Sequence, residues 1–318
     1  MVKEENDMSF LEIKDIKVHY PIRGGFFNKI IDYVYAVDGV NMIIEEGKTY
    51  GLIGESGSGK STIGKAIVGL EPLTSGNLLY KGQSLKNMKD MRRNKYNKDV
   101  QMIFQDSLSS LDPKKRVRDI IAEPLRNFFN LTPQEELKRV YQLLEIVGMP
   151  DDSIFKYPFE FSGGQRQRIG IARAIACEPK LIVADEPVSA LDLSVQAQVL
   201  NYMKAIQKEF NLSYIFISHD LGVVKYMCDY IYIMNNGRFV ETGTREDIYN
   251  NSKHIYTKKL IAAIPEIDPD MREKSYQNRI FVDKQYQDNF EKYFTKNNKV
   301  YDLQKISDTH FVAMKGDI

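Results

Sequence analysis

The sequence predicts an α/β protein built on a parallel sheet, to which an antiparallel β layer, a helical insert and a C-terminal extension are joined. Three observations carry this prediction. A Gly-rich segment at residues 54–61 lies directly between a short apolar run and a helical pattern. Apolar runs typical of buried strands alternate with helical periodicity between residues 181 and 217. After about Pro265 the composition turns polar, with scattered aromatic residues.

The composition excludes several classes of function. With 318 residues the chain is long enough to bury a sizeable core. Its 44 Lys and Arg residues nearly balance its 43 Asp and Glu residues, so no overall positive field favours nucleic acid or an anionic membrane. We therefore expect no nucleic-acid partner, and any phosphate binding must depend on local groups.

No segment has the pattern of a targeting or membrane-spanning sequence. The N-terminal residues lack the apolar stretch of a secretory signal. The best apolar run, residues 181–184, stops at Asp185, whereas a bilayer span needs about 20 residues. We expect the chain to stay in the cytoplasm unless a partner holds it at a membrane.

The sequence contains two cysteines, Cys177 and Cys228, in unrelated contexts. Two thiols are too few for a disulfide framework or for a four-thiolate metal or iron–sulfur site. We predict that both are buried and serve as small apolar residues.

The first 177 residues predict three kinds of structure. Residues 10–44 alternate apolar and polar side chains around a Gly-containing insert at 21–25, which predicts short antiparallel strands. Residues 50–53 form a short buried strand that is followed by a helix over 60–70. Helical spacing over 133–147 and 165–177 predicts an all-helical insert.

The second half returns to strands. Strand signals at 181–184 and 214–217 enclose a helical pattern at 195–210, which implies a parallel sheet. Residues 230–240 predict a hairpin that turns at Asn236 and Gly237.

We divide the chain into a domain of residues 1–265, with a helical subdomain at about 107–176, and an extension of residues 266–318. In the extension, four aromatic residues share one helical face, and docking on the protein's own body is favoured over a partner contact. These residues are Tyr286, Phe290, Tyr293 and Phe294.

The Gly-rich segment has the pattern of a phosphate-binding loop between a strand and a helix. Its residues, with the helical residue that follows, are Gly54, Glu55, Ser56, Gly57, Ser58, Gly59, Lys60, Ser61 and Thr62. The glycines let successive N–H groups point at one anion, and the helix N-terminus adds a positive dipole. Lys60 can bridge the outer phosphates, and Ser61 can ligate Mg²⁺. The alternative is a tight Gly turn with an accidental lysine.

Two carboxylates follow the predicted strand at residues 181–184. The C-terminal ends of strands are where α/β folds place ligands. Asp185 suits the Mg²⁺ coordination shell, and Glu186 suits the orientation or deprotonation of an attacking water. Taken alone, such acids commonly cap the next helix.

A second candidate anion site opens the helix predicted at 165–177. Ser162, Gly163, Gly164 and Gln165 place a hydroxyl and free N–H groups at a helix N-terminus. An ordinary N-cap is the alternative function for a lone Ser-Gly-Gly sequence.

Together these motifs resemble the ATP-binding-cassette (ABC) family over residues 10–265. Residues 161–165 are similar to its Leu-Ser-Gly-Gly-Gln signature, although Phe161 stands in place of the leucine. By resemblance, Gln105 is the Q-loop glutamine, which touches Mg²⁺ and water. Residues 189–192, with Asp192, resemble the D-loop, which lines the interface between two cassettes. His219 resembles the switch histidine that contacts the γ-phosphate.

The family usually stacks adenine on an aromatic residue that precedes the phosphate loop. We assign Tyr20 to this role because it follows the first predicted strand. Phe26, Phe27 and Tyr33 remain alternatives.

Three blocks, at 161–173, 186–198 and 254–265, resemble the oligopeptide and dipeptide importer ATPases, and most closely the F-type subunit. The usual His-Pro-Tyr is His-Ile-Tyr at 254–256. Some relatives carry an iron–sulfur cluster on cysteines near the C-terminus. No cysteine follows Cys228, so we expect no cluster.

The resemblance implies an ABC-type nucleotide-binding domain with a RecA-like core, and an ATPase that uses ATP and Mg²⁺ to drive oligopeptide import. Two cassettes would clamp two ATP molecules between them. The expected partners are a D-type second cassette that forms a heterodimer, two transmembrane permeases and an extracytoplasmic solute-binding protein. The expected location is the cytoplasmic face of the membrane, as a peripheral subunit.

Four alternatives stay open at this point. They are an importer for nickel or another solute, a soluble non-transport cassette, an exporter, and a small GTPase or kinase. The sequence lacks the Asn-Lys-x-Asp motif that reads guanine, which argues against the last.

Overall fold

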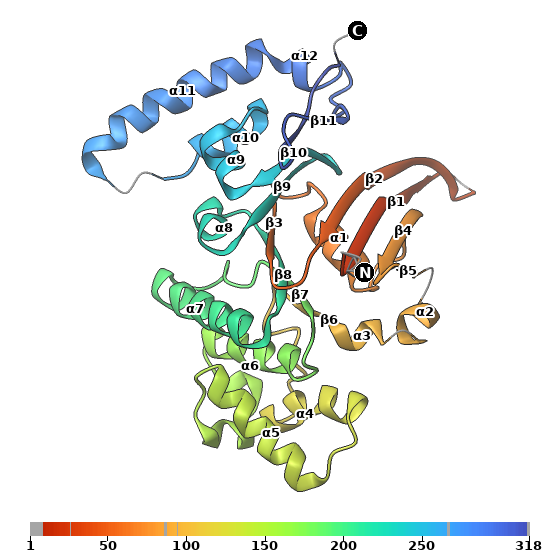
Figure 1. Ribbon diagram of the computed structural model, residues 1–318, viewed down its shortest axis with the longest axis vertical. Helices are drawn as coiled ribbons and strands as arrows, with labels where there is room; N and C mark the ends of the chain where they lie inside the picture. Colours follow the sequence, from red (N-terminus) through yellow and green to blue (C-terminus); the bar gives the residue numbers. More distant parts are fainter. Residues whose placement is uncertain (1–8, 26, 86–87, 94, 266–267, 317–318) are drawn as a thin grey trace, which may run out of the picture.

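The computed structural model describes residues 9–25, 27–85, 88–93, 95–265 and 268–316 and contains two sheets (Figure 1). The smaller sheet has the order β2-β1-β4-β5, and the larger has the order β11-β12-β10-β9-β3-β8-β7-β6. The smaller consists of β1 (Leu11–Gly24), β2 (Lys29–Ile44), β4 (Ser75–Tyr80) and β5 (Gln83–Ser84). The larger consists of β3 (Thr49–Ile53), β6 (Val100–Ile103), β7 (Leu181–Asp185), β8 (Ser213–Ser218), β9 (Tyr230–Asn235), β10 (Arg238–Thr244), β11 (Leu303–Lys305) and β12 (Phe311–Ala313).

Helices surround the larger sheet. The α-helices are α1 (Lys60–Ile67), α2 (Met88–Arg93), α3 (Tyr96–Asp99), α4 (Val117–Phe128), α5 (Pro133–Ile146), α6 (Gly163–Ile175), α7 (Leu193–Phe210), α8 (Leu221–Met227), α9 (Arg245–Asn251), α10 (Ile255–Ala262), α11 (Arg272–Asp288) and α12 (Phe290–Tyr293). Short 3₁₀ turns are η1 (Asp151–Phe155), η2 (Pro158–Glu160) and η3 (Pro269–Met271). Among the described residues, no helix combines the length and the apolar character that a bilayer span requires.

The centre of the larger sheet is parallel, as the sequence predicts. From β6 through β7, β8 and β3 to β9, each neighbouring pair of strands runs in the same direction. The predicted helix at 195–210 is α7, which begins two residues earlier. The predicted helix at 60–70 is α1, which ends at Ile67, before Gly69 with its positive φ of 78°.

The two faces of this sheet have separate cores, and β8 shows the division. Its residues Tyr214 and Phe216 pack with α7 and the helical insert, whereas Ile215 and Ile217 pack with α1 and the smaller sheet. All six residues of β8 are buried. A strand covered on both faces is apolar throughout rather than alternating, which explains the continuous apolar runs in the sequence.

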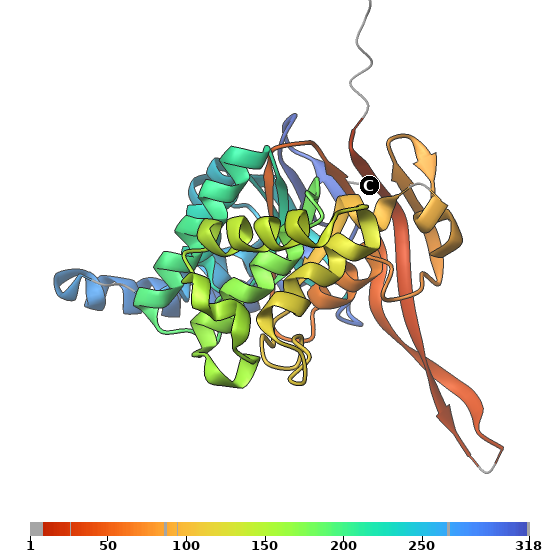
Figure 2. The same ribbon diagram turned by 90° about the horizontal axis from the view of Figure 1, so that it is seen from below.

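The prediction of short N-terminal strands was wrong. β1 and β2 have 14 and 16 residues, and the insert at 21–24 belongs to β1. The turn comes later, where the N–H of Asn28 donates to the carbonyl of Gly25 at 3.2 Å. The pairing of the two strands continues from Leu11 opposite Ile44 to Gly24 opposite Lys29, through several register shifts. In Figure 2 this hairpin extends well beyond the body of the protein.

The all-helical insert is confirmed and consists of α4, α5 and α6 with two 3₁₀ turns. The helix predicted at 133–147 is α5, which begins with a capping box between Thr132 and Glu135. Pro133, at the first position of this helix, needs no N–H partner there.

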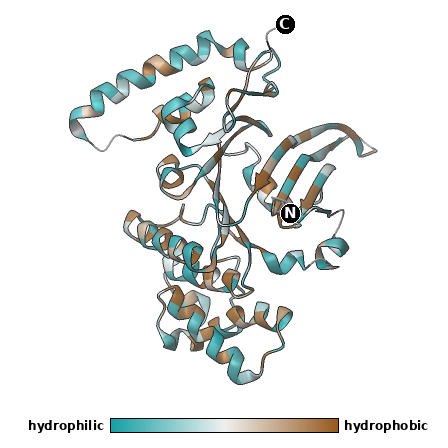
Figure 3. Ribbon diagram, viewed as in Figure 1, coloured by the Kyte–Doolittle hydropathy of each residue, from teal (hydrophilic) through white to brown (hydrophobic). Residues whose placement is uncertain are grey.

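The extension packs on the rest of the chain. β12 pairs with β10, so that Val312 lies opposite Glu241 and the larger sheet continues into residues 303–313. The side chains of Tyr286, Phe290, Tyr293 and Phe294 pack against the core, which confirms docking on the protein's own body. By contrast, α11 is mostly hydrophilic (Figure 3), and in it Val282 is the buried residue.

A buried polar cluster joins the extension to the sheet. The carboxylate of Glu241, which is fully buried, accepts from His310 Nε2 at 2.8 Å and from the backbone N–H groups of Lys253 and His254 at 2.6 and 3.1 Å. In turn, His254 Nδ1 accepts from the N–H of Tyr256 at 3.1 Å. Burial lowers the pKa of His254 to about 3.

His254 should make the protein sensitive to acid. Because the folded state holds His254 neutral, only the unfolded state takes up this proton between pH 6.5 and about 3. The free energy of unfolding should therefore fall as the pH falls through that window, and His254 should contribute about 1.4 kcal/mol of this loss per pH unit. Urea unfolding at several pH values should show a shallower loss for His254→Gln than for the wild type. Curves of equal slope below pH 6 would contradict the prediction, and the comparison above pH 7 is the control.

Candidate functional site

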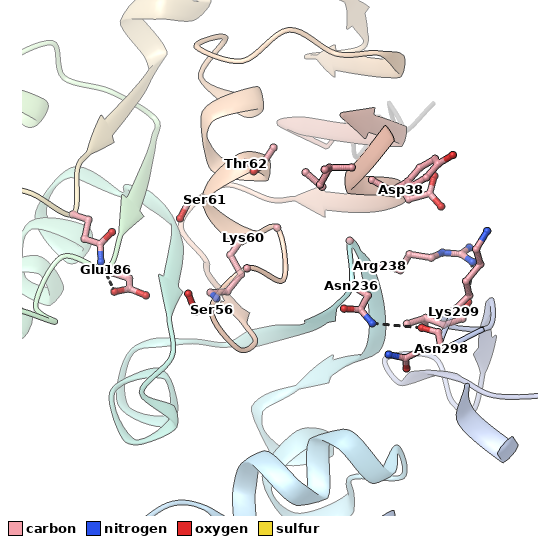
Figure 4. Close-up of a pocket in the computed structure, with 18 residues that line it drawn as sticks. Asp38, Ser56, Lys60, Ser61, Thr62, Glu186, Asn236, Arg238, Asn298 and Lys299 are labelled. Carbon is pink, nitrogen blue, oxygen red and sulfur yellow. Dashed lines mark hydrogen bonds between the residues drawn. The ribbon is translucent and has the colours of Figure 1, made fainter. Parts of the chain in front are cut away.

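A cavity of about 530 Å³ lies at the edge of the larger sheet where β3 ends. Its lining comes from four parts of the chain: β2, the phosphate loop with α1, the turn between β9 and β10, and the extension (Figure 4). Gln105 and Glu186 complete one end. The cavity thus brings the predicted phosphate loop and two of the predicted catalytic residues together.

The phosphate loop runs from the end of β3 into α1, as predicted. Gly54 and Gly59 are required by close backbone contacts, since a Cβ at either would lie 2.2 Å from Met234 O or 2.1 Å from Ala36 O. Gly59 also has φ 107°. At Gly57, with φ 80°, a Cβ would meet no atom within 4 Å.

Lys60 is buried at the centre of the loop. Its ammonium donates to the carbonyls of Gly54 and Glu55, each at 2.8 Å. Burial lowers the pKa of Lys60, while the carboxylates of Glu186 and Asp185 oppose this shift. Burial of the charged ammonium of Lys60 therefore costs free energy, and an anion bound in the loop would offset that cost.

Ser61 and Asp185 form a pair suited to a divalent cation. Ser61 Oγ donates to Asp185 Oδ1 at 2.9 Å, although 124 positions separate them in the chain. Burial raises the pKa of Asp185, and the neighbouring Glu186 carboxylate raises it further, while the Ser61 bond lowers it. Hydroxyl and carboxylate oxygens are ligands that Mg²⁺ prefers, so the residues fit this ion.

Glu186 is held between the two other predicted catalytic residues. Gln105 Nε2 donates to Glu186 Oε2 at 2.8 Å, and His219 Nδ1 lies 3.0 Å from Glu186 Oε1. Glu186 has a positive φ of 46°, and its N–H donates to Ile217 O at 3.0 Å. A strained backbone fixed by a neighbouring strand is common at functional positions.

The signature residues, 162–165, are not among the described residues that line this cavity. Ser162 and Gln165 form a capping box at the start of α6: Ser162 Oγ accepts from the Gln165 N–H at 3.3 Å, and Gln165 Oε1 accepts from the Ser162 N–H at 3.0 Å. Gly164 is required by packing, since a Cβ would lie 2.4 Å from Val195. At Gly163 a Cβ would find space, with its nearest neighbour at 3.6 Å.

Asp192, from the predicted D-loop, caps α7. Its Oδ1 accepts from the N–H of Val195 at 3.0 Å, and this bond and one from Ser194 lower the pKa of Asp192. Like the signature residues, it does not line the described cavity.

The adenine assignment stays a prediction. Burial and the nearby Glu71 raise the pKa of Tyr20, whose hydroxyl also contacts Thr62 on the cavity wall. Of the alternatives, Phe27 is 79% exposed and Tyr33 is 40% exposed. The remaining one, Phe26, lies outside the described residues.

Sequence reasoning missed several residues at the cavity. Tyr35 lines it, although Tyr33 was the residue considered. The turn at 236–238 and the extension residues 298–300 also line it, and nothing in their local sequence marks them as site residues. Tyr256 lies behind the loop, where its hydroxyl accepts from the N–H of Glu55 at 3.1 Å. The sequence does carry a signal for Tyr256, because this residue belongs to the block at 254–265 that resembles the importer ATPases.

The fold and the cavity define a class. A strand–loop–helix unit with a buried lysine, and a carboxylate pair at the end of a nearby parallel strand, form the site of a P-loop ATPase. A further feature is expected of an ATP-binding cassette: a helical insert in which Ser162 caps the start of α6.

Comparisons with known proteins agree. The ABC transporter family model matches residues 37–189, and the model for the C-terminal region of oligopeptide/dipeptide transporters matches residues 240–285. The chain is 58% identical over 304 residues to the oligopeptide transport ATP-binding protein OppF of Lactococcus lactis subsp. lactis, covering 96% of this chain and 95% of that protein. It is 49% identical to OppF of Salmonella typhimurium, covering 84% and 81%.

Solved structures show the same fold. A dimeric post-hydrolysis state of the ATP-binding cassette MJ0796, bound to ADP and Pi, matches with a TM-score of 0.66 and 26% identity, over 74% of this chain and 98% of that one. The chain therefore belongs to the oligopeptide and dipeptide transport ATP-binding proteins, the ATPase subunits of ABC transporters. The predicted family, fold class and ATPase activity are confirmed.

Tyr256 should position the phosphate loop. Tyr256→Phe leaves the Glu55 N–H without its partner, and ATP affinity should fall about 2- to 10-fold, the scale of one hydrogen bond. Titration of the full-length chain with ATP would measure this. Tyr232→Phe is the matched control, because that buried hydroxyl accepts from Ile43 N–H in the smaller sheet. Equal ATP affinity in the two variants would refute the role.

Proposed function

We propose that this chain hydrolyses ATP to drive the uptake of oligopeptides through a separate pair of permeases. The observation that carries the proposal is the placement of Glu186 between Gln105 and His219, beside the loop that holds Lys60. The relatives named as oligopeptide transport proteins support peptide as the solute.

In the proposed site, the backbone N–H groups of residues 54–62 and the ammonium of Lys60 hold the phosphates. Tyr20 is proposed to stack on adenine. Ser61, Asp185 and Gln105 would hold Mg²⁺. When bound, this ion neutralises charge on the outer phosphates.

Glu186 is the proposed general base. A carboxylate that accepts hydrogen bonds from two side chains is fixed in orientation, and Glu186 lines the same cavity as Lys60, which supports this role. His219 would contact the γ-phosphate. Because phosphoryl transfer needs little covalent help, alignment and charge stabilisation account for the catalysis.

The signature residues are proposed to serve a second cassette. The side chains of Ser162 and Gln165 already cap their own helix, but the backbone N–H groups of Gly163 and Gly164 belong to its first turn, beside the exposed Ser162. An ATP held by a partner's loop would meet Ser162, Gly163, Gly164 and Gln165 there, with Asp192 at the interface. The partner is proposed to be a D-type subunit.

The remaining assembly follows from the family. Two transmembrane permeases and an extracytoplasmic solute-binding protein are proposed to complete the importer, with this chain at the cytoplasmic face as a peripheral subunit. We propose residues 1–265 as the ATP-binding domain, with a helical subdomain at about 107–176, and residues 266–318 as the importer-type extension.

No iron–sulfur cluster is proposed. The sequence has two cysteines, and four thiolates are the usual requirement. Burial raises the pKa of Cys177 to about 12 and also raises that of Cys228, so neither is suited to act as a thiolate ligand.

Glu186→Gln tests the proposed base. This change keeps the shape of the side chain but removes its basicity, so ATP binding should persist while turnover falls at least ~10²-fold. The ATPase rate of the reconstituted transporter would measure it. Glu209→Gln, at an exposed position on α7, is the control. Near-normal turnover of the Glu186→Gln transporter would remove Glu186 from the role.

Ser162→Arg tests whether the signature serves a partner. The isolated chain should bind ATP almost normally, because its own loop is unchanged, whereas ATPase activity with the D-type partner and permeases should be lost. Lys60→Ala should instead weaken ATP binding by the isolated chain. Loss of ATP binding by a folded Ser162→Arg monomer would show that the signature acts on the same chain's nucleotide.

A further inference from the structure

A loop of the C-terminal extension reaches the nucleotide cavity. Asn298, Lys299 and Val300 line the same space as the phosphate loop, Tyr35 of β2 and the turn before β10. These residues are more than 230 positions from the loop in the chain. The extension is therefore part of the cavity wall as well as a covering of the sheet.

This loop is held firmly in place. Its two ends meet at an antiparallel bridge between Phe294 and Val300, which are 0% and 2% exposed. Inside it, the N–H of Thr295 donates to Lys299 O at 2.8 Å, and the N–H of Asn298 donates to Thr295 O at 2.9 Å. The side chain of Lys299 is thus presented from a fixed backbone.

The turn between β9 and β10 anchors the loop to the ATPase core. Arg238 Nη1 donates to Val300 O at 2.9 Å, and its other amino group pairs with Asp302 at 2.5 Å. Asn236 Nδ2 donates to Asn298 O at 3.4 Å. Arg238 is engaged by Asp302, whereas Lys299 presents a second cationic side chain at this end of the cavity.

The orientation of ATP follows from the two ends of the cavity. Glu186 lies on one side of Lys60 in Figure 4, whereas Asn298 and Lys299 lie on the other. The reacting γ-phosphate must lie near the base, Glu186, and the outer phosphates near Lys60. The nucleoside end of the molecule therefore points toward β2 and the extension.

The chemistry of Lys299 suits this end. Its ammonium lies 6.0 Å from the centre of the Tyr35 ring. Within the described residues it makes no hydrogen bond or ion pair, so its three N–H groups can donate to other acceptors. Ribose hydroxyls and the ring nitrogens of adenine are acceptors of that kind.

We propose that Lys299 of the C-terminal extension binds the nucleoside end of the ATP molecule that this chain's own phosphate loop holds. The proposal rests on the proposed function, in which the triphosphate binds at Lys60. It makes the extension a component of the nucleotide site in the same chain, independent of the signature that serves the partner.

Nucleotide titrations of the full-length chain test the proposal. Lys299→Ala should weaken ATP and ADP by the same factor, roughly 3- to 10-fold, the scale of one charge-assisted hydrogen bond at a partly exposed site. It should leave the affinity for inorganic tripolyphosphate unchanged, because that ligand has no nucleoside. Lys296→Ala removes the same charge from an exposed position of the same loop that does not line the cavity, and should change neither affinity.

Three other results would overturn the proposal. ATP and ADP affinities equal to the wild type in Lys299→Ala would show that the lysine makes no contact. Equal losses in Lys299→Ala and Lys296→Ala would reduce the effect to net charge. A loss of tripolyphosphate affinity in Lys299→Ala would place the lysine at the phosphates. The proposed binding of the triphosphate at Lys60 is tested separately, because Lys60→Ala must lower the affinity for ATP, ADP and tripolyphosphate. If these affinities do not fall, the triphosphate does not bind at Lys60.

Discussion

Three parallel strands end at one edge of the larger sheet, and this alignment brings together the residues proposed to bind and hydrolyse ATP. The phosphate loop leaves β3, Asp185 ends β7 with Glu186 directly after it, and His219 follows β8. The hydrogen bond from Ser61 to Asp185 exists because these strands are paired in this register. A slip of one residue would turn buried side chains of β7 to the opposite face and separate the carboxylates from the loop. The packing of both sheet faces therefore supports the catalytic geometry directly.

The parts of this arrangement that the sequence predicted are those encoded within short segments. The phosphate loop, the acids after β7 and the start of α6 each depend on neighbouring residues, and the resemblance supplied Gln105 and His219. The position of the hairpin turn was missed, because the proline and the Gly pair at 21–25 are typical turn residues, whereas the pairing of β1 with β2 continues through Gly24. β11 and β12 have three residues each, too few to show a period, and their pairing with β10 depends on contacts distant in sequence.

The start of α6 shows how one segment serves two requirements. Ser162 and Gln165 satisfy each other's backbone groups, and Gly164 makes room for Val195, so packing and capping explain these residues without a ligand. Gly163 is different, because no close neighbour excludes a side chain there. A helix N-terminus with an unencumbered glycine leaves its N–H groups accessible to an anion, which is the physical basis for a role beyond capping.

The extension and the phosphate loop are connected by a continuous series of polar contacts. His310 donates to the buried Glu241, which accepts from the N–H of His254; His254 accepts from the N–H of Tyr256, and the Tyr256 hydroxyl accepts from the N–H of Glu55 in the loop. Each buried group in this series has few alternative partners, so a shift at one end leaves a polar group unsatisfied elsewhere. The extension reaches the cavity a second time through the loop that Arg238 anchors. Both connections lead to the same cavity, so a family-specific segment supports and lines a general ATPase site.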